Sequence, residues 1–303
     1  MLNSERGGEQ TGSSSEVPRR AFLRGSLVAS GTILAAPFAA RPDAAAAEKD
    51  SKELNQKKTI LAIGAHMDDA EIGAGGVLIQ AARAGHRVVI VTVVSDYRTW
   101  LPTVGREEQT KRDLTALAQR FGFEKRFLDY PYHQIHSGDV ELKRKLAEIH
   151  AELKPDIAFI HHDEDHWPDH VASGQASHDA LLFAHGLSHD MAIQRCPLIY
   201  AYDVSPAQTY HFEPDVYYDV TEVMPAYMDL LAGTDSCLSG RPVPEVVQYE
   251  FRTVGATSAA IPLSGHGLSR FADCVRFGQR ANCRFAIGFR TVWGPRRGPS
   301  LLA

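Results

Sequence analysis

A strand, a loop and a helix are encoded around Gly64-Ala65-His66-Met67-Asp68-Asp69-Ala70-Glu71-Ile72-Gly73-Ala74-Gly75-Gly76. The apolar segment 59–63 before it has the β-branched and aliphatic residues of a buried strand. The segment 77–84 after it has helical character and ends at the glycine stop Gly85. One histidine and two carboxylates within four residues cannot all point the same way, so this loop offers ligands in two directions.

The chain continues to alternate in the same way. Further strands are predicted at 87–94, 125–130 and 156–160, and helices at 106–121, 139–153 and 171–184. Strands that alternate with helices of this length favour βαβ units and a parallel sheet. The C-terminal third is less regular, with strands expected at 197–204 and 215–220, helices at 221–231 and 269–280, and cleft-bordering loops at 238–244 and 261–267.

Composition sets the class of protein. The 303 residues are 44% hydrophobic and 23% charged, as expected of a globular chain with one large core. A formal net charge of -5 offers no broad basic face, which argues against nucleic acid as the main partner. The four cysteines form no C-x-x-C pair, so a cysteine zinc site is poorly supported, while disulfides and free thiols both stay open.

The N-terminus has the order of regions found in a twin-arginine export signal. Polar residues precede Arg19-Arg20, and a short apolar segment at 25–40 is followed by the alanines 44–47. Residues 1–47 are therefore assigned to an export signal and polar leader, with the twin-arginine translocation machinery as a partner. No later stretch has the roughly 18 uninterrupted apolar residues of a stable membrane span. We expect the mature protein to be exported, periplasmic or extracellular.

Two polar clusters follow predicted strands at the edge where ligands bind in open α/β sheets, namely residues 66–69 and 161–170. Two imidazoles and one carboxylate make a three-ligand zinc site with an open position for water. We assign His66, Asp69 and His170 as ligands of Zn²⁺. Asp68, just outside this set, is the predicted general base that takes the proton of the attacking water. A general acid must then protonate a leaving amine.

These residues resemble a known family. Residues 65–73 are similar to the A-H-P-D-D-E-E-I-G signature of the PIG-L/LmbE-like N-acetylglucosaminyl deacetylases, and Trp167-Pro168-Asp169-His170 resembles their later H-P-D-H. Segments 212–221 and 286–290 look like the family's F-x-P-D...D-I-T segment and a degraded A-E-A-F-R. The resemblance covers about residues 57 to 290 and implies an LmbE-like α/β fold, Rossmann-like and three-layered, with a mostly parallel sheet and an irregular C-terminal portion.

The resemblance also implies a function and domain limits. It places the metal on the three ligands named above and the general base on Asp68. An exported zinc-dependent hydrolase is therefore expected, which removes the N-acetyl group from an N-acetylglucosamine-type amino sugar or conjugate. The deacetylase domain is assigned to 48–290 and a tail to 291–303.

The departures from the family pattern fall around the second cluster. Trp167 stands where the family has the first histidine of H-P-D-H, its candidate oxyanion donor or general acid. We expect His166 to substitute, with Asp169 or Asp165 orienting it. Tyr132 stands where members tend to carry a sugar-binding aspartate. The family's late histidine, near A-H-x-S-Q, is missing from 232–236, and no role is assigned to isolated histidines such as His86, His150, His211 and His266.

Three side chains are candidates for substrate binding. Trp167 is suited to stacking on a sugar ring, Tyr132 takes the place of the family's sugar-binding aspartate, and Arg106 opens a helix beside the site and is suited to a hydroxyl or an anion. Gly73, Gly75 and Gly76 do not have G-x-G-x-x-G spacing and follow acidic residues that would repel a pyrophosphate, which excludes a dinucleotide site.

Two other functions are considered. His66-x-Asp68 with a histidine about a hundred residues later also matches the 2-His-1-carboxylate triad of non-haem iron oxygenases. Those triads sit in all-β barrels, which the strand and helix alternation disfavours. The alternative from another class is a catalytically impaired exported carbohydrate-binding protein on the same fold. The altered H-P-D-H supports it, and Asp68 opposes it, because a binding protein needs no base.

Overall fold

The computed structural model describes residues 56–99, 103–188, 192–205, 208–242, 246–249, 259–262 and 265–295. The described residues all belong to one compact unit, Glu48–Ala303. The expected export signal at 1–47 lies outside the described residues, as does most of the expected tail.

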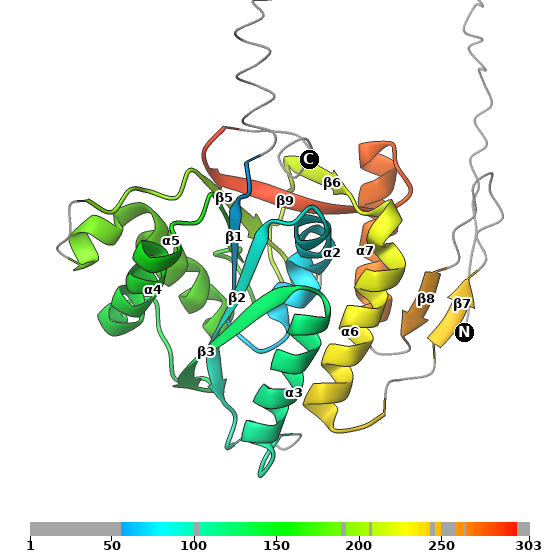
Figure 1. Cartoon of the computed structure of the whole chain (residues 1–303), viewed down its shortest axis with the longest axis horizontal. Helices are drawn as coiled ribbons and strands as arrows, with labels where there is room; N and C mark the ends of the chain where they lie inside the picture. Colours follow the sequence, from blue (N-terminus) through cyan, green and yellow to red (C-terminus); the bar gives the residue numbers. More distant parts are fainter. Residues whose placement is uncertain are drawn as a thin grey trace, which may run out of the picture. The chain divides into compact units, whose positions relative to one another are not determined.

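Seven strands form one sheet in the order β3-β2-β1-β4-β5-β9-β6 (Figure 1). The strands are β1 (Thr59–Gly64), β2 (Arg87–Asp96), β3 (Phe123–Pro131), β4 (Ile157–His161), β5 (Leu198–Tyr202), β6 (Val216–Asp219) and β9 (Ala286–Trp293). Neighbours among β1 to β5 pair in parallel, and β9 is antiparallel to both β5 and β6. The chain leaves β1 towards β2 and β3 and returns to β4 on the other side of β1. The carboxyl ends of β1 and β4 therefore flank a topological switch point.

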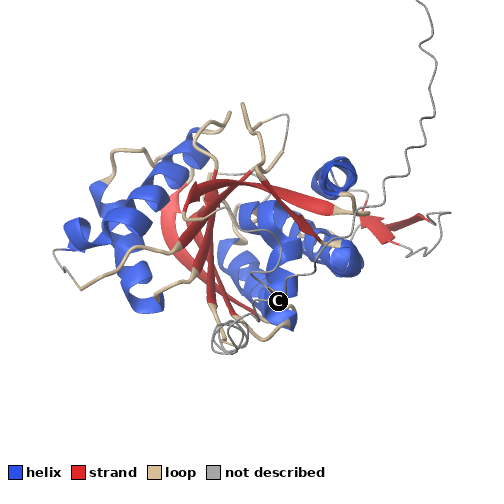
Figure 2. Ribbon diagram, turned by 90° about the horizontal axis from the view of Figure 1, so that it is seen from above, coloured by secondary structure: helices blue, strands red, loops and turns tan. Residues whose placement is uncertain are grey.

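Helices cover both faces of this sheet, as Figure 2 shows. One face carries α4 (Val140–Leu153) and α5 (Pro168–Ser188), and the other carries α2 (Asp69–Arg83), α3 (Glu107–Arg120), α6 (Met224–Ser239) and α7 (Gly265–Ala281). Alternate residues of β1 serve the two cores: Ile60 and Ala62 lie in one cluster, Leu61 and Ile63 in the other. This arrangement confirms the expected three-layer α/β fold. A two-stranded antiparallel sheet is added by β7 (Val246–Tyr249) and β8 (Ala259–Pro262).

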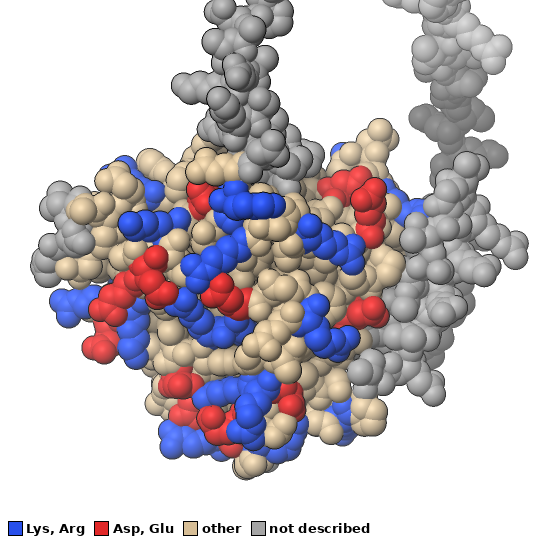
Figure 3. Space-filling model, in the orientation of Figure 1, with Lys and Arg blue, Asp and Glu red and all other residues tan. Residues whose placement is uncertain are grey.

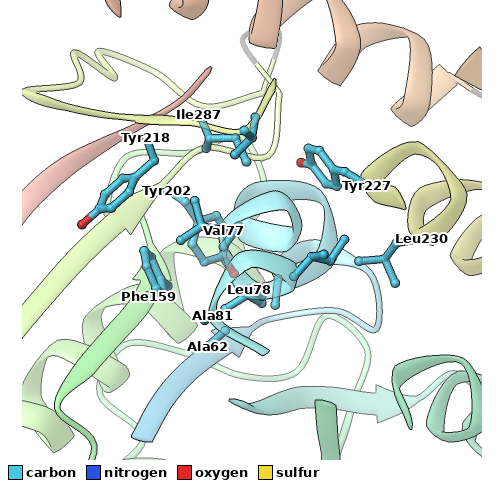
Figure 4. Close-up of a cluster of buried hydrophobic side chains, with 14 of the residues drawn as sticks. Ala62, Val77, Leu78, Ala81, Phe159, Tyr202, Tyr218, Tyr227, Leu230 and Ile287 are labelled. Atoms are coloured by element: carbon cyan, nitrogen blue, oxygen red, sulfur yellow. The ribbon is translucent and has the colours of Figure 1, made fainter. Parts of the chain in front are cut away.

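Helix α2 lies at the centre of one core. Figure 4 shows Val77, Leu78 and Ala81 of α2 between side chains of the sheet and Tyr227 and Leu230 of α6. All of these side chains are buried. Each large apolar side chain buried in this way contributes on the order of 1.5–3 kcal/mol. The core therefore holds the start of α2, and with it the end of β1, in a fixed position.

The prediction of a loop over 64–76 is wrong, because α2 already begins at Asp69. Its glycines lie inside the helix, where aromatic rings approach the backbone. A Cβ at Gly73 would lie 2.0 Å from Cδ2 of Tyr202, and one at Gly75 would lie 2.8 Å from Cε2 of Tyr227. The Tyr202 hydroxyl donates to the Ile63 carbonyl at 2.8 Å, so the same ring ties β5 to β1. Close packing, rather than a flexible loop, accounts for the glycines.

The C-terminal portion is more regular than the sequence indicates. Helix α6 reaches Ser239, well beyond the helix expected to end at 231, and α7 begins at Gly265, inside a segment expected as a loop. Strand β9 was not expected, and it runs to Trp293, into the range assigned to the tail. Its residues 286–289 are buried between β5 and β6.

Three general properties complete the fold. None of the helices in the described part of the chain has the length and apolar character needed to cross a membrane. The four cysteines form no disulfide with one another. On the face drawn in Figure 3, Lys and Arg side chains are interspersed with Asp and Glu.

Candidate active site

The two polar clusters meet at the switch point. His66 follows β1, Asp69 is the first residue of α2, and His170 lies in the first turn of α5, which follows β4. One nitrogen of each imidazole and one carboxylate oxygen all lie within 4.8 Å of one another. His66 Nδ1 is 3.0 Å from His170 Nε2, and Asp69 Oδ1 is 3.5 Å from the same Nε2. The structure thus brings together the three residues predicted as metal ligands.

The outer nitrogens of both imidazoles contact carboxylates. His66 Nε2 lies 3.1 Å from Asp169 Oδ2, and His170 Nδ1 lies 3.0 Å from Asp165 Oδ1. An ionised carboxylate accepts and does not donate, so these outer nitrogens carry the protons. In the neutral rings the two inner nitrogens then present lone pairs to each other and to Asp69. Such an acceptor-only cluster is suited to a cation, and its His-Asp-His composition suits zinc.

Asp165 and Asp169 therefore contact other side chains than the one predicted. They contact the ligand imidazoles rather than orienting His166. Asp169 also accepts from the backbone nitrogen of His133 at 3.0 Å, and Asp165 accepts from Thr209 Oγ1 at 2.8 Å. Carboxylates in this position fix the orientation and tautomer of metal-binding histidines.

Buried polar contacts also hold the ligand loop, residues 66–69, which carries two of the three candidate metal ligands. Asp69 Oδ2 accepts from the backbone nitrogen of His66 at 2.5 Å and lies 3.0 Å from His161 Nε2. Burial opposes ionisation of Asp69, but the adjacent imidazoles, His170 first, hold its pKa well below its usual value. Lys125 Nζ donates to Glu71 at 2.5 Å and to the Met67 carbonyl at 2.8 Å, with both charged side chains almost fully buried. The loop is thus fixed before any ligand binds.

Asp68 lies beside the ligand cluster and is not one of the converging groups. Burial and the neighbouring charge of Asp69 raise the pKa of its carboxyl to about 6. A carboxyl with a raised pKa is a stronger base once ionised, and a general base works best with a pKa near the working pH. Asp68 thus has the position and the basicity expected of a general base.

A cavity of about 220 Å³ adjoins these groups. Its lining includes the predicted residues Tyr132 and Trp167, and Tyr97 belongs to the same wall. The rings lie around His66, with centroids 5.4 Å (Tyr132), 6.1 Å (Trp167) and 6.2 Å (Tyr97) from its imidazole. Among the residues that the structure describes, the lining consists of His66, Asp68, Asp69, Ile72, Tyr97, Tyr132, Trp167, His170, Val204, Gln208, Leu238 and His266.

Two predicted residues lie elsewhere. His166 is exposed, does not line this cavity, and its Nδ1 lies 3.2 Å from the Tyr210 hydroxyl. The guanidinium of Arg106 contacts the backbone carbonyls of Cys237 and Leu238, at 3.2 and 3.4 Å, and is not part of the lining either. Arg106 therefore joins α3 to the end of α6.

His266, to which the sequence analysis assigns no role, is one of the cavity residues that it missed. His266, in the first turn of α7, lines the cavity, and its Nδ1 lies 3.8 Å from Asp68 Oδ2 and 3.4 Å from Asp235 Oδ1. The hydrogen bond to Asp235 and the charge of Asp68 raise the pKa of this imidazole to about 9. The only signal for it in the sequence was its place within 261–267, a segment expected to border the cleft.

Comparisons with known proteins find similarities in sequence and in fold. The family model described as PIG-L, GlcNAc-PI de-N-acetylase, matches residues 61–181. Residues 61–181 of this chain are thus similar to the PIG-L family. The uncharacterized deacetylase YaiS of Escherichia coli strain K12 is 27% identical over 176 residues, which are 55% of this chain and 85% of YaiS. The family match and this relative together support a deacetylase, a hydrolase of amide bonds.

Solved structures share the fold of this chain at low identity. The N,N'-diacetylchitobiose deacetylase of Pyrococcus horikoshii is 17% identical, with a TM-score of 0.60 over 87% of this chain and 96% of its own. The conserved protein TT1542 of Thermus thermophilus is 18% identical, with a TM-score of 0.61 over 80% and 98%. The 4-carboxy-2-hydroxymuconate hydratase GalB of Pseudomonas putida KT2440 is 19% identical, with a TM-score of 0.59 over 79% and 98%. Because a hydratase is among them, the fold alone does not decide the reaction.

Proposed function

We propose that this protein is an exported, Zn²⁺-dependent N-deacetylase that removes the acetyl group from an N-acetylglucosamine-type amino sugar or its conjugate. The observation that carries the proposal is the convergence of His66 Nδ1, the Asp69 carboxylate and His170 Nε2, with Asp68 beside them. The names of the matching family and of the Pyrococcus horikoshii enzyme support an N-acetylated sugar as the substrate class.

The ligand set suits zinc for chemical reasons. Imidazole nitrogen and carboxylate oxygen are ordinary zinc ligands, and three protein ligands leave one position for water, as in catalytic sites. Bound Zn²⁺ would supply a Lewis acid and lower the pKa of its water towards neutrality. The contribution of Asp165 and Asp169 is to hold the two imidazoles in the tautomers that present lone pairs inward.

Asp68 supplies the proton acceptor for the reaction. As water attacks the acetyl carbonyl carbon, the Asp68 carboxylate takes one of its protons, and the carbonyl oxygen gains negative charge. The pKa of about 6 keeps most Asp68 groups ionised at neutral pH. This residue favours an enzyme over the binding protein on the same fold, since binding a sugar requires no base.

The cavity is suited to a sugar ring beside the acetyl group. Tyr97, Tyr132 and Trp167 form an aromatic wall next to His66, and Gln208 adds a polar group. Aromatic faces pack against the apolar faces of ligands, and a few polar groups then fix orientation. We therefore assign Trp167 and Tyr132 to substrate binding.

Acetate release tests the proposal. The zinc-loaded full chain is incubated with N-acetylglucosamine, its oligomers and simple N-acetylglucosaminides, and free acetate is measured. Release by the wild type is expected to fall about 10²–10⁴-fold in Asp68→Asn, the contribution of a positioned general base. Asp229→Asn, an exposed position on α6, is the matched control and is expected to keep full activity.

Two results would contradict it. Bound zinc at one equivalent without acetate release from any member of the panel would point to the binding protein or to another amide. Equal activity of wild type and Asp68→Asn would remove the assigned base.

Export is tested separately. The proposal predicts that the protein reaches the periplasm or the medium in a host with the twin-arginine machinery. Replacing both Arg19 and Arg20 with lysine is expected to retain the chain in the cytoplasm, as followed by fractionation and immunoblotting. Unchanged export of that double variant would exclude this route.

A further inference from the structure

We propose that His266 is the general acid of this site, donating the Nε2 proton to the leaving amine nitrogen, and that Asp235 is the residue that positions it. The inference rests on the proposed deacetylase function. It concerns residues outside 61–181, the part of the chain that the family model matches.

The geometry places one imidazole between two carboxylates at the cavity. Asp235 on α6 and Asp68 before α2 both approach Nδ1 of His266, at 3.4 and 3.8 Å. Because Nδ1 faces the carboxylates, Nε2 is the nitrogen whose proton is available to a ligand in the cavity. The arrangement follows the logic of a catalytic dyad, in which a carboxylate fixes the tautomer and orientation of a histidine.

A buried arginine on α7 anchors the helix that carries His266. The side chain of Asp235 is 18% exposed, and that of His266 is 45% exposed, as a group that exchanges protons with solvent requires. One helical turn after His266, the fully buried Arg270 pairs with Asp203 at 3.1 Å and donates to the carbonyls of Asp203 and Val204 at 2.6 and 2.7 Å. Arg270 thus anchors the start of α7 to the end of β5.

His166, the residue that the sequence suggested for this role, lacks these features. It is exposed, it does not line the cavity, and its Nδ1 contacts the Tyr210 hydroxyl rather than a carboxylate. The two carboxylates expected to orient it are instead in contact with His66 and His170. Among the histidines of the cavity, His66 and His170 are committed to the ligand cluster, which leaves His266.

The proton balance is complete with these groups. Asp68 takes one proton from water as the oxygen bonds to the acetyl carbon. His266 Nε2 gives one proton to the amide nitrogen, and the C–N bond breaks with its electron pair going to that nitrogen. Acetic acid and a neutral amine leave. Asp68 then releases its proton to water and His266 takes one back, so the enzyme returns to its starting state.

Electrostatics support the assignment. Asp235 and Asp68 together raise the pKa of His266 to about 9, with a smaller contribution from Asp69. The imidazole is therefore protonated at neutral pH and holds the proton that a general acid donates.

A leaving-group comparison tests the role. The zinc-loaded full chain and His266→Gln are assayed on an N-acetyl amino sugar and on 4-nitrophenyl acetate, whose phenolate leaves without protonation. General acid catalysis predicts a fall in kcat/KM of about 10²-fold or more on the amide. It predicts little change on the ester, whereas Asp68→Asn should lose activity on both. His178→Gln is a matched control, since His178 is 42% exposed and lies 3.1 Å from Asp179.

Two further variants are compared: Asp235→Asn tests the positioning residue, and His166→Gln tests the other candidate acid. Asp235→Asn is expected to reproduce part of the amide-specific loss and to lower the pKa of the His266 ring, followed by its NMR titration. An equal loss of His266→Gln on both substrates, or full amide activity of that variant, would overturn the proposal. A larger amide-specific loss in His166→Gln than in His266→Gln would also overturn it.

The proposed function and this inference can fail independently. If the wild type released no acetate from any N-acetyl substrate, the deacetylase function would be lost, and the NMR titration would still decide the dyad. A His266 ring that titrates near pH 6.5 in the wild type, or unchanged in Asp235→Asn, would overturn the dyad even in an active deacetylase.

Discussion

The wall of the cavity formed by the β1–α2 loop and residues 161–170 differs from the wall formed by α6 and α7. In the first wall, His66 and Asp69 follow β1, and His170 follows β4. Each of these side chains also contacts a carboxylate or a backbone group outside the ligand cluster. In the second, Asp235 and His266 project from helices that meet only in the tertiary structure. The first lies within the residues that match the PIG-L model, and the second lies outside them.

This difference indicates a division of labour, by which we mean that the two walls have different chemical roles in the reaction. Under the proposed function, the first wall supplies the metal ligands and the base. Under the further inference, the second wall supplies the acid that protonates the leaving amine. Substitutions in the two walls should therefore affect different steps, even where they affect stability equally.

The largest effects are expected from the two buried ion pairs that anchor the walls. Lys125 and Glu71 are 0% and 3% exposed, and Arg270 and Asp203 are also 0% and 3% exposed. Removing one partner leaves an uncompensated buried charge, which costs about 3–5 kcal/mol. Lys125→Met and Arg270→Met are both expected to lower the free energy of unfolding by this amount, measured by urea denaturation.

The two variants should differ in function. Lys125→Met releases the Met67 carbonyl and the ligand loop, so it should weaken zinc binding. Arg270→Met releases α7, so it should spare zinc affinity and lower turnover of the amide more than that of the ester. Arg87→Met is the control: its pair with Glu124 is exposed, and such pairs contribute about 0–1 kcal/mol. Equal losses of zinc affinity in both buried variants would contradict the division of labour.

A smaller effect is expected from Asp165 and Asp169, whose carboxylates contact the imidazoles of the candidate ligands. Asp165→Asn and Asp169→Asn keep the shape of the side chain but offer a weaker acceptor to the imidazole N–H. Outer partners of this kind contribute about 10–100-fold to metal affinity. Each variant should therefore bind Zn²⁺ more weakly by this factor in competition with a chelator.

The exposed Asp163, on the same segment, provides the comparison. Asp163→Asn should bind zinc as the wild type does. Unchanged affinity in both Asp165→Asn and Asp169→Asn would show that these carboxylates do not act on the ligands.

The first wall could be predicted from the sequence because its chemistry is local. His66, Asp68 and Asp69 lie within four residues after a strand, and His170 lies in a second cluster after another strand. A parallel sheet brings such strand ends together without further information. The partners of Asp165 and Asp169 could not be predicted, because several histidines lie equally near them in the sequence and only the fold selects between them.

The second wall could not be predicted for a different reason. His266 has no ligand or carboxylate beside it in the sequence, and Asp235 is 31 residues away. A lone histidine gives no signal until helix packing places it. The prediction of a loop at the glycines of α2 failed for a similar reason. The rings of Tyr202 and Tyr227, which pack against these glycines, come from distant segments.

The smallest expected effect is a pH-dependent change in stability from the second wall. Asp235, Asp68 and Asp69 raise the pKa of His266 from 6.5 to about 9, so the folded state binds this proton more tightly than the unfolded state. The resulting stabilisation is fully present below pH 6.5 and is lost as the pH rises through about 9. In Asp235→Asn the first of these carboxylates is neutral. The gap in unfolding free energy between wild type and Asp235→Asn should thus be largest near pH 6 and should close above pH 9. Asp229→Asn should show no such pH-dependent gap, and a gap in Asp235→Asn that stays constant from pH 6 to 10 would mean that Asp235 acts on its surroundings through packing rather than through the charge of His266.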